Sequence, residues 1–475
     1  MKMRRTALVL VVITLSFPVA AAAQPPAPSA AADPGYYFLL GRRLEAIGQV
    51  DKAIAAYNDA LKLAPGSAEL RAELAGLYAR QDRAVEAVQS AEAALKEDPQ
   101  NREANRILGS IYAALADQRV SLRTGEDPAL YVPRAIAALE RARAGGGPDP
   151  SVDMTLARLY VQTKAYDKAV PLLRRVGAEQ PGSPDVALLL ATAEEGAGRT
   201  ADAIVTLREA VADNPKFFRG LVMLGELSEK QGEWDSAADA YERAQALNSR
   251  IDLSTRRAAA LINAGKAAAA RDLLGPGAAK TDATPLLLYL YASSQRQAGD
   301  LAGAEATARR LRAAAPDDPR GMYVLAQVLE ARKDFAGAEG ALRDILKRDA
   351  TDATALNYLG YMLAERGERL DEAVDLVQRA LKLEPGNPSF LDSLGWAYYR
   401  QGKLELADAP LTEAATRMPN NSVIQDHLGD LRFKQRRFAD AAAAWQRSLA
   451  GDGDSINRPA IEKKIQDARS RLENR

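Results

Sequence analysis

The sequence predicts an all-α protein that folds as a solenoid of stacked helical hairpins. Small residues and prolines recur at a period of about 34 residues, and the apolar content is mostly Ala and Leu, with only 6% aromatic residues. Ala and Leu favour helices, whereas the β-branched and aromatic residues that favour strands are sparse. The chain has 475 residues. Since a single compact domain rarely grows that long, either several domains or a repeat array is expected.

The repeat is clearest in a series of twelve alanines that begins at Ala53. The others follow about every 34 residues, apart from one insertion, at Ala87, Ala135, Ala169, Ala203, Ala237, Ala270, Ala304, Ala338, Ala373, Ala407 and Ala441. About twelve residues before each, with longer gaps in the third and tenth repeats, stand Gly41, Ala75, Gly109, Ala157, Ala191, Gly225, Ala258, Ala292, Ala326, Gly360, Gly395 and Gly429. Because two helices approach closely only where side chains are small, each pair predicts a tight helix crossing.

Other residues mark where the helices begin and end. Proline recurs twelve residues after several of these alanines, at Pro65, Pro99, Pro181, Pro215, Pro316, Pro385 and Pro419. A proline just after a helix cannot continue it and forces the turn into the next unit. Carboxylates that are expected to cap the second helix of a hairpin stand at Asp51, Asp167, Asp235 and Asp371. One hairpin cannot bury its own apolar face, so the hairpins must stack.

These markers resemble the tetratricopeptide repeat, and the resemblance runs from about Pro34 to Ser455. It implies a right-handed superhelical α-solenoid of about twelve helix-turn-helix repeats. We place the repeats at 34–67, 68–101, 102–149, 150–183, 184–217, 218–250, 251–284, 285–318, 319–352, 353–387, 388–421 and 422–455. Residues 456–475 are predicted to form a C-terminal capping helix, with Asn457 as its cap and Ile461, Ile465 and Leu472 as its apolar positions.

Two repeats depart from the pattern. The third carries about fourteen extra residues at 116–134, which predict a lengthened helix followed by a loop. The seventh, 251–284, is degenerate because Gly275-Pro276-Gly277 replaces the expected end of its second helix. It divides an N-terminal array (34–250) from a C-terminal array (285–455), and two interpretations stay open: a flexure between the arrays, or drift in a spacer repeat.

The N-terminus has the pattern of a secretory signal peptide at 1–23. Lys2, Arg4 and Arg5 precede a short apolar stretch, and Ala21-Ala22-Ala23 offers a cleavage site before Gln24. The alternative is an uncleaved membrane anchor. Residues 24–33 are Ala/Pro-rich and predict a linker. We therefore expect a periplasmic or secreted protein, cleaved after Ala23, with no further transmembrane span.

Composition argues against several classes of function. The chain has 63 basic and 63 acidic residues, without the basic excess that nucleic-acid binding requires. It has no cysteine, which excludes disulfides and thiolate metal sites. Its only histidine, His427, is expected at the surface or in a groove, and no base–nucleophile pair accompanies it. We predict no catalytic residue, no metal and no cofactor; an enzyme would need a further domain.

In tetratricopeptide proteins, particular first-helix positions line a concave groove. On the last three repeats these positions predict a protein- or peptide-binding site made of Asn357, Tyr361, Asp392, Trp396, Tyr399, Asp426 and Asp430. We hypothesise that Trp396 and the tyrosines anchor an apolar segment while the aspartates attract a cationic one. The alternative is that Trp396 packs against the neighbouring repeat. Trp445 and Trp234 are expected to be structural.

The blocks DSLGW (392–396) and DHLGD (426–430) resemble secreted or envelope-associated tetratricopeptide proteins of Gram-negative bacteria. Some of that group are adaptors, including lipoproteins that hold a carboxyl-terminal processing protease, although the lipid-anchor cysteine is missing here. The resemblance implies a non-catalytic periplasmic scaffold whose partner is a protein or peptide, such as an envelope protease or an assembly or export component. The alternative is a small-molecule- or polysaccharide-binding protein of an envelope export or assembly system.

Overall fold

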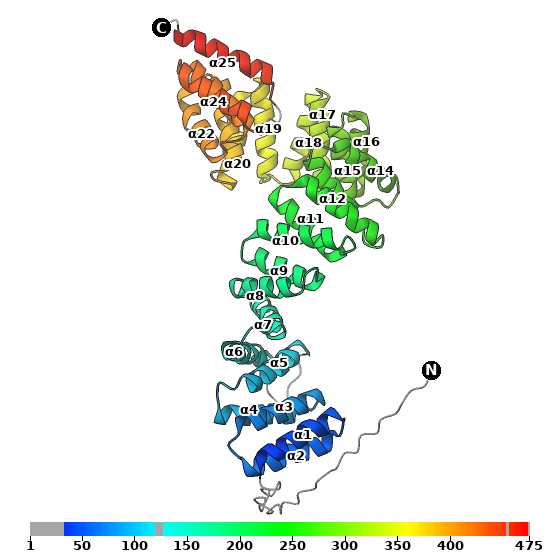
Figure 1. Cartoon of the computed structure of the whole chain (residues 1–475). Helices are drawn as coiled ribbons and strands as arrows, with labels where there is room; N and C mark the ends of the chain where they lie inside the picture. The colour runs from blue at the N-terminus through cyan, green and yellow to red at the C-terminus, as the bar shows by residue number, and fades with distance from the viewer. Residues whose placement is uncertain (1–32, 119–126, 453–455, 474–475) are drawn as a thin grey trace, which may run out of the picture. The chain divides into compact units, whose positions relative to one another are not determined.

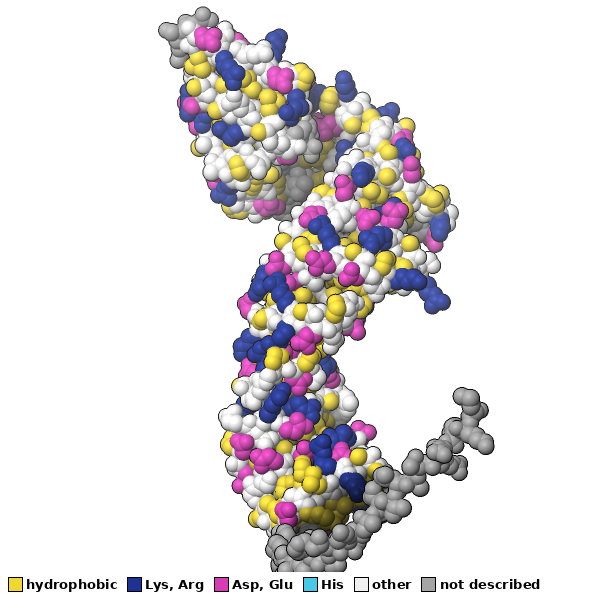
Figure 2. Space-filling model, viewed as in Figure 1, with side chains coloured by type: hydrophobic (Ala, Val, Ile, Leu, Met, Phe, Trp, Pro, Cys, Tyr) yellow, Lys and Arg dark blue, Asp and Glu magenta, His cyan; other side chains and the backbone are white. Residues whose placement is uncertain are grey.

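A computed structural model describes residues 33–118, 127–452 and 456–473, and the predicted signal peptide and almost all of the predicted linker lie outside them. The described chain folds into helices without strands. It divides into two compact units, residues 1–220 and 221–475. Basic and acidic side chains are interspersed over the visible face of each unit (Figure 2).

Unit 1 is a stack of helical hairpins (Figure 1). Its helices are α1 (Pro34–Ala46), α2 (Val50–Leu63), α3 (Ala68–Arg80), α4 (Ala84–Glu97), α5 (Arg102–Gln118), the 3₁₀ turn η2 (Pro128–Leu130), α6 (Tyr131–Ala144), α7 (Pro150–Gln162), α8 (Tyr166–Glu179), α9 (Pro184–Gly196) and α10 (Thr200–Asp213). Each helix packs against the next along the chain. The first helices of neighbouring repeats also contact each other, for example α3 with α5 and α5 with α7.

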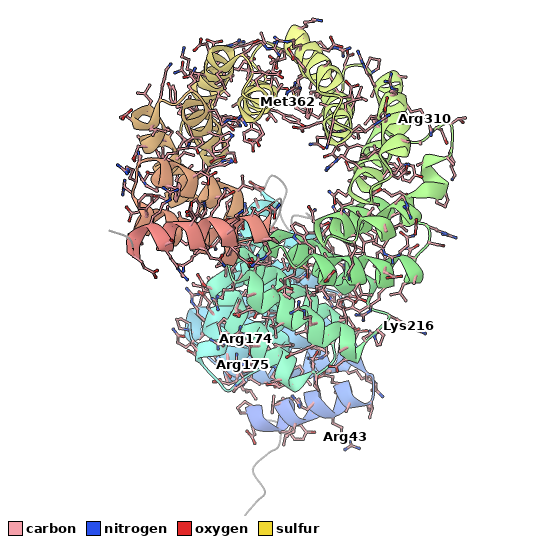
Figure 3. The ribbon with its side chains drawn as sticks, turned by 90° about the horizontal axis from the view of Figure 1, so that it is seen from above. Arg43, Arg174, Arg175, Lys216, Arg310 and Met362 are labelled. Atoms are coloured by element: carbon pink, nitrogen blue, oxygen red, sulfur yellow. The ribbon has the colours of Figure 1, made fainter. Side chains whose placement is uncertain are left out.

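Unit 2 repeats this arrangement, and its helices follow a curved path (Figure 3). Helix α11 (Phe218–Gln231) spans the boundary between the units. It is followed by α12 (Trp234–Leu247), α13 (Ser254–Asn263), α14 (Ala267–Ala278), α15 (Pro285–Gln297), α16 (Leu301–Ala314), α17 (Pro319–Ala331), α18 (Phe335–Arg348), α19 (Ala353–Arg366), α20 (Leu370–Leu383), α21 (Pro388–Arg400), α22 (Leu404–Arg417), α23 (Ser422–Lys434), α24 (Phe438–Ala450) and α25 (Arg458–Glu473).

The all-α repeat fold is confirmed, and the period is accurate. The first helix of each hairpin begins at the predicted start of its repeat, except α13, which begins at Ser254 rather than at residue 251. The twelve recurring alanines all have 0% exposed surface. The Gly or Ala that precedes each of them is buried as well. The small residues therefore sit at the helix crossings, as the sequence predicts.

Large side chains fill the space that the glycines leave. Where the first helix carries Gly at the crossing, the side chain sixteen residues later usually leans against it: Tyr57 on Gly41, Tyr241 on Gly225 and Trp445 on Gly429. A Cβ added to Gly429 would lie 2.4 Å from the Trp445 ring. Trp445 is 2% exposed, which confirms its predicted structural role.

Two local predictions need correction. The aspartates expected to cap second helices lie one residue inside them: Asp51, for example, follows Val50, and the preceding Gln49 makes no side-chain cap bond. Such a carboxylate stabilises the first turn through the helix dipole instead. Side-chain caps occur on first helices, as Ser67 and Asn421 show, and on the second helices α16 and α18 through Asp300 and Asp334. Helix α14 also continues through Pro276 to Ala278, so the Gly275-Pro276-Gly277 segment does not end it early.

The structure also tests the insertion in the third repeat and the C-terminal capping helix. Helix α5 has 17 residues, which confirms the lengthened helix of the third repeat, and most of the loop after it lies outside the described residues. In α25 the Asn457 side chain accepts a hydrogen bond from the Ala460 N–H at 3.2 Å, and Ile461 and Ile465 are buried. Leu472 is 40% exposed and does not join this apolar face, because α25 buries Ala468 and ends at Glu473.

Two Gly→Ala substitutions in helices of unit 2 are predicted to have opposite effects. Gly429→Ala should destabilise the protein, because displacing the Trp445 ring costs about 1–3 kcal/mol, more than the helix propensity gained. Gly340→Ala, in α18, should stabilise it by about 0.5–1 kcal/mol, because no atom lies within 4 Å of the added Cβ. Urea unfolding followed by circular dichroism measures both. Equal shifts of the two midpoints would contradict the close-crossing argument.

Candidate functional site

The seven predicted binding residues lie on three first helices of unit 2. Helix α19 carries Asn357 and Tyr361, α21 carries Asp392, Trp396 and Tyr399, and α23 carries Asp426 and Asp430. Helix α21 packs against both α19 and α23, so these helices lie side by side. We call these seven residues the α19–α21–α23 patch. The structure joins most of them into one network through two residues that the sequence analysis did not assign to it.

The first of these is His427, which lies at the centre of the network. Its ring stacks on Trp396, with ring centroids 4.0 Å apart and planes 13° apart, and lies 6.2 Å from the Tyr361 ring. Its Nδ1 is 3.0 Å from both carboxylate oxygens of Asp392. His427 is only 6% exposed, so the expectation of a surface or groove histidine is wrong. The carboxylate one repeat earlier and the indole face account for its burial.

The electrostatics of His427 follow from its neighbours on each packed helix. Burial opposes the charged imidazolium, but Asp392 on α21, together with Asp426 and Asp430 on α23, outweighs burial and raises the pKa of His427 above its ordinary value. The carboxylate therefore faces a ring that holds its proton more tightly than a free histidine does.

Trp396 does not project from α21 as its spacing suggested. It is 7% exposed, and its Nε1–H donates to Glu365 Oε2 at 2.7 Å. The Tyr399 ring also stacks on Trp396, and their ring centroids are 4.8 Å apart. The structure thus shows the alternative considered above, in which Trp396 packs against residues of neighbouring repeats. The indole fixes His427 and Tyr399 in place.

The second unassigned residue is Lys464 of the capping helix α25. Its Nζ lies 2.8 Å from Asp426 and 2.7 Å from Asp430. Burial raises the pKa of Asp430 above its usual value, and Lys464 offsets only part of that rise. Burial opposes the charge on Lys464, but the two aspartates outweigh it and raise the pKa of Lys464. Lys464 therefore compensates one of the two aspartate charges within the chain, and the patch is less electronegative than expected.

What remains for a partner is a set of neutral polar groups on an aromatic wall. Tyr361 and Tyr399 are half-buried. Burial, followed by the nearby Asp430, raises the pKa of Tyr399 to about 12, so its hydroxyl stays protonated. The Oδ1 of Asn357 is buried and has no hydrogen-bond partner among the described residues. Because Asn357 and Tyr361 are one turn apart on α19, they share a face of that helix.

The described residues contain no group of three or more His, Asp or Glu side chains placed to hold a metal ion. Within the same ranges, every helix is too short or too polar to cross a bilayer.

Comparison with known proteins places this repeat in a family. A tetratricopeptide repeat model matches residues 38–102, 188–250, 323–388 and 368–422, and a second such model matches 132–193. Together these matches span more than half of the chain. It belongs to the tetratricopeptide repeat family. Tandem tetratricopeptide repeats are protein-interaction scaffolds and are generally non-catalytic.

Individual relatives share parts of the chain. A TPR repeat-containing protein of Pseudomonas aeruginosa is 34% identical over 209 residues, which cover 44% of this chain and 35% of that protein. Cellulose synthase operon protein C of Xanthomonas axonopodis is 26% identical over 398 residues, which cover 79% of this chain and 23% of that protein. This chain thus spans about a third or less of these relatives. Yeast Tom70 aligns over 93% of this chain and 96% of its own, at 14% identity and a TM-score of 0.47.

The His427–Asp392 pair predicts a pH-dependent contribution to stability. Since the folded-state pKa of His427 is raised, the pair stabilises the fold fully below the unfolded pKa of about 6.5, and this contribution is lost as pH rises through the folded pKa. The free energy of unfolding of the wild-type protein, measured by urea unfolding, should therefore exceed that of the His427→Gln variant. The difference should be largest at about pH 6 and smallest at about pH 9. A difference that is constant across this range would show that the imidazole acts only by packing.

Proposed function

We propose that this protein is a periplasmic scaffold that holds a protein or peptide segment against the α19–α21–α23 patch. The single observation that carries the site is the unpaired Oδ1 of Asn357. A buried acceptor without a donor is costly, and an amide N–H of a bound segment would satisfy it once the Asn357 side-chain amide turns toward the groove. The half-buried side chains of Tyr361 and Tyr399 each supply an apolar ring and a hydroxyl donor. This combination suits a partly apolar segment.

The role of the charged residues in this proposal follows from their partners. Asp392 holds His427, and Lys464 contacts both Asp426 and Asp430, so these aspartates shape the patch and only part of their negative charge is left for a partner. Trp396 supports the wall from behind. The expected ligand is therefore less cationic than the acidic residues alone would suggest. An envelope protease, or a component of an assembly or export system, remains the class of partner that we propose.

The test combines capture of a partner with a substitution that removes the Asn357 side-chain amide. Full-length protein should retain a protein from an envelope extract of the source cells, and the purified partner should bind Asn357→Ala at least about tenfold more weakly than wild type. The variant should keep its stability, because it removes an acceptor that has no partner. Gln378→Ala on α20 is the matched control, since it also removes an amide but from an exposed site outside the patch. Equal affinities for all three proteins would refute the proposed site.

The relative named for a cellulose synthase operon favours a second candidate, a polysaccharide-binding role in an envelope export system. Tyrosine rings and an amide acceptor also suit sugar rings and hydroxyl groups. Titration of the protein with soluble cello-oligosaccharides would distinguish the two. Saturable binding that Asn357→Ala abolishes would support the sugar ligand, and no binding beside a confirmed protein partner would dismiss it.

The proposed location rests on the signal-like N-terminus. We expect the mature protein in the periplasmic fraction, with Gln24 as its first residue, because the small residues before it suit a signal peptidase. Cell fractionation and N-terminal sequencing measure both. A chain that keeps its first 23 residues in the membrane fraction would establish the uncleaved anchor instead.

A further inference from the structure

A second candidate site lies in unit 1, on helices of other repeats. A cavity of about 520 Å³ opens between α6, α7 and α8. Arg143, Lys168 and Arg175 line it, together with an apolar floor that includes Leu156 and Leu172. Two of its three helices, α6 and α8, are the second helices of their hairpins, so this cavity does not belong to a first-helix groove of the kind predicted for the last repeats.

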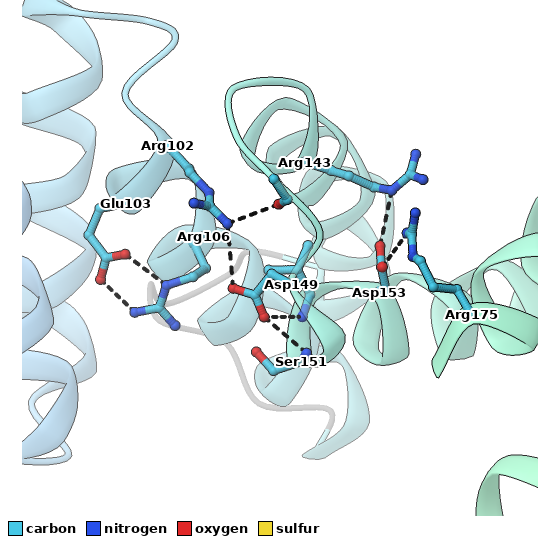
Figure 4. A network of polar contacts seen from close by, with 10 residues as sticks. Arg102, Glu103, Arg106, Arg143, Asp149, Ser151, Asp153 and Arg175 are labelled. Atoms are coloured by element: carbon cyan, nitrogen blue, oxygen red, sulfur yellow. Dashed lines mark hydrogen bonds and ion pairs between the residues drawn. The ribbon is translucent and has the colours of Figure 1, made fainter. Parts of the chain in front are cut away.

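The charges at the base of this cavity do not balance. Asp153 is 1% exposed, and its carboxylate accepts from Arg143 Nε at 3.0 Å and from a terminal nitrogen of Arg175 (Figure 4). One carboxylate thus serves two guanidinium groups. The Nε of Arg175 is buried and has no hydrogen-bond partner among the described residues. A positive charge is left over at the cavity wall, and one buried N–H donor has no acceptor.

The remaining charged residues of the cavity compensate each other. The Tyr160 hydroxyl donates to Glu140 Oε1 at 2.5 Å, and Lys168 Nζ lies 3.2 Å from the same oxygen. The hydrogen bond from Tyr160 lowers the pKa of Glu140, so this carboxylate stays charged beside Lys168. The excess positive charge therefore belongs to the two arginines.

The loop after α6, which lines part of the cavity with Gly146 and Pro148, is fixed by local contacts. Arg102 donates to the Gly147 carbonyl at 3.2 Å and lies 3.9 Å from Asp149, which caps α7 through the Ser151 N–H (Figure 4). A Cβ at Gly146 would come within 2.5 Å of the Arg102 Nε, so glycine lets the loop close over this side chain. The cavity is preformed, which is typical of ligand sites.

The neighbouring cavity shows that the basic excess is specific. Arg174, next to Arg175 on α8 (Figure 3), faces a second cavity of about 460 Å³ between α8, α9 and α10. There a single guanidinium serves two carboxylates, the 1%-exposed Glu194 at 2.7 Å and Asp202 at 3.1 Å. The two cavities on either side of α8 therefore have opposite charge balance.

We propose that the Arg143–Arg175 cavity binds a carboxylate attached to an apolar group. The carboxylate would lie between the two guanidiniums and accept from their terminal N–H groups, while the apolar group would cover Leu156 and Leu172. The surplus of one positive charge matches a monoanion better than a phosphate dianion. This site is independent of the proposed α19–α21–α23 site, so either assignment stands without the other.

The probe is 4-phenylbutyrate, with 4-phenylbutyramide as the uncharged control, titrated calorimetrically into the full-length protein. The acid should bind at least about tenfold more tightly than the amide. Arg143→Gln and Arg175→Gln should each weaken the acid by about the same factor, and Arg174→Gln, the matched control on α8, should leave it unchanged. Equal binding of acid and amide, or equal losses in all three variants, would overturn the proposal.

A fourth variant covers the case in which loss of an arginine unfolds the repeat. Asp153→Asn removes the carboxylate that competes for both guanidiniums, so it should bind 4-phenylbutyrate more tightly and show a larger rise of Tm with the ligand. Weaker binding by Asp153→Asn would contradict the site. Displacement of the probe by inorganic phosphate at lower concentration than by acetate would reassign the cavity to phosphate groups.

Discussion

The close crossing of two helices at small side chains is the constraint on which the rest of the structure depends. Every recurring alanine is fully buried, and the Gly or Ala opposite it lets the two backbones approach. This contact fixes which face of each helix points inward, and so fixes where the next hairpin can stack. Where Gly replaces Ala, the space is filled by a larger partner, such as Tyr57, Tyr241 or Trp445.

Stacking at one repeat length also sets the pattern of charge pairing. Arg42 pairs with Glu73, Arg199 with Asp167 and Arg343 with Glu372, each about one repeat away in the chain. Such exposed pairs contribute little, about 0–1 kcal/mol each. These ion pairs place basic and acidic side chains next to one another on the surface, but they do not hold the stack together. The buried alanines and leucines do.

The sequence was sufficient for the elements that depend on period and insufficient for those that depend on side-chain partners. The starts of the helices follow from the spacing of the small residues, because every repeat packs its two helices in the same way. The extra residues in the third repeat therefore predicted the lengthened α5. The seven predicted binding residues do lie on neighbouring first helices, as their spacing predicts. The burial of Trp396 was not predictable, since it depends on His427 from the next repeat and Glu365 from the previous one. Lys464 was missed because α25 belongs to no repeat, although its place between the buried Ile461 and Ile465 is a usable signal.

The buried charges distinguish a structural cluster from a site that is open to a ligand. A buried ion is tolerated only if partners compensate it, and the cost rises when a partner is missing. At His427 the pairing of buried groups is complete, although one ammonium serves two carboxylates: Asp392 holds the imidazole, and Lys464 contacts both aspartates beside it. At Asp153 it is incomplete, because two guanidiniums share one carboxylate and one N–H has no acceptor. The fold does not require that imbalance, since the neighbouring cavity on α8 has the opposite one; a ligand that supplies the missing acceptor gives it a physical reason.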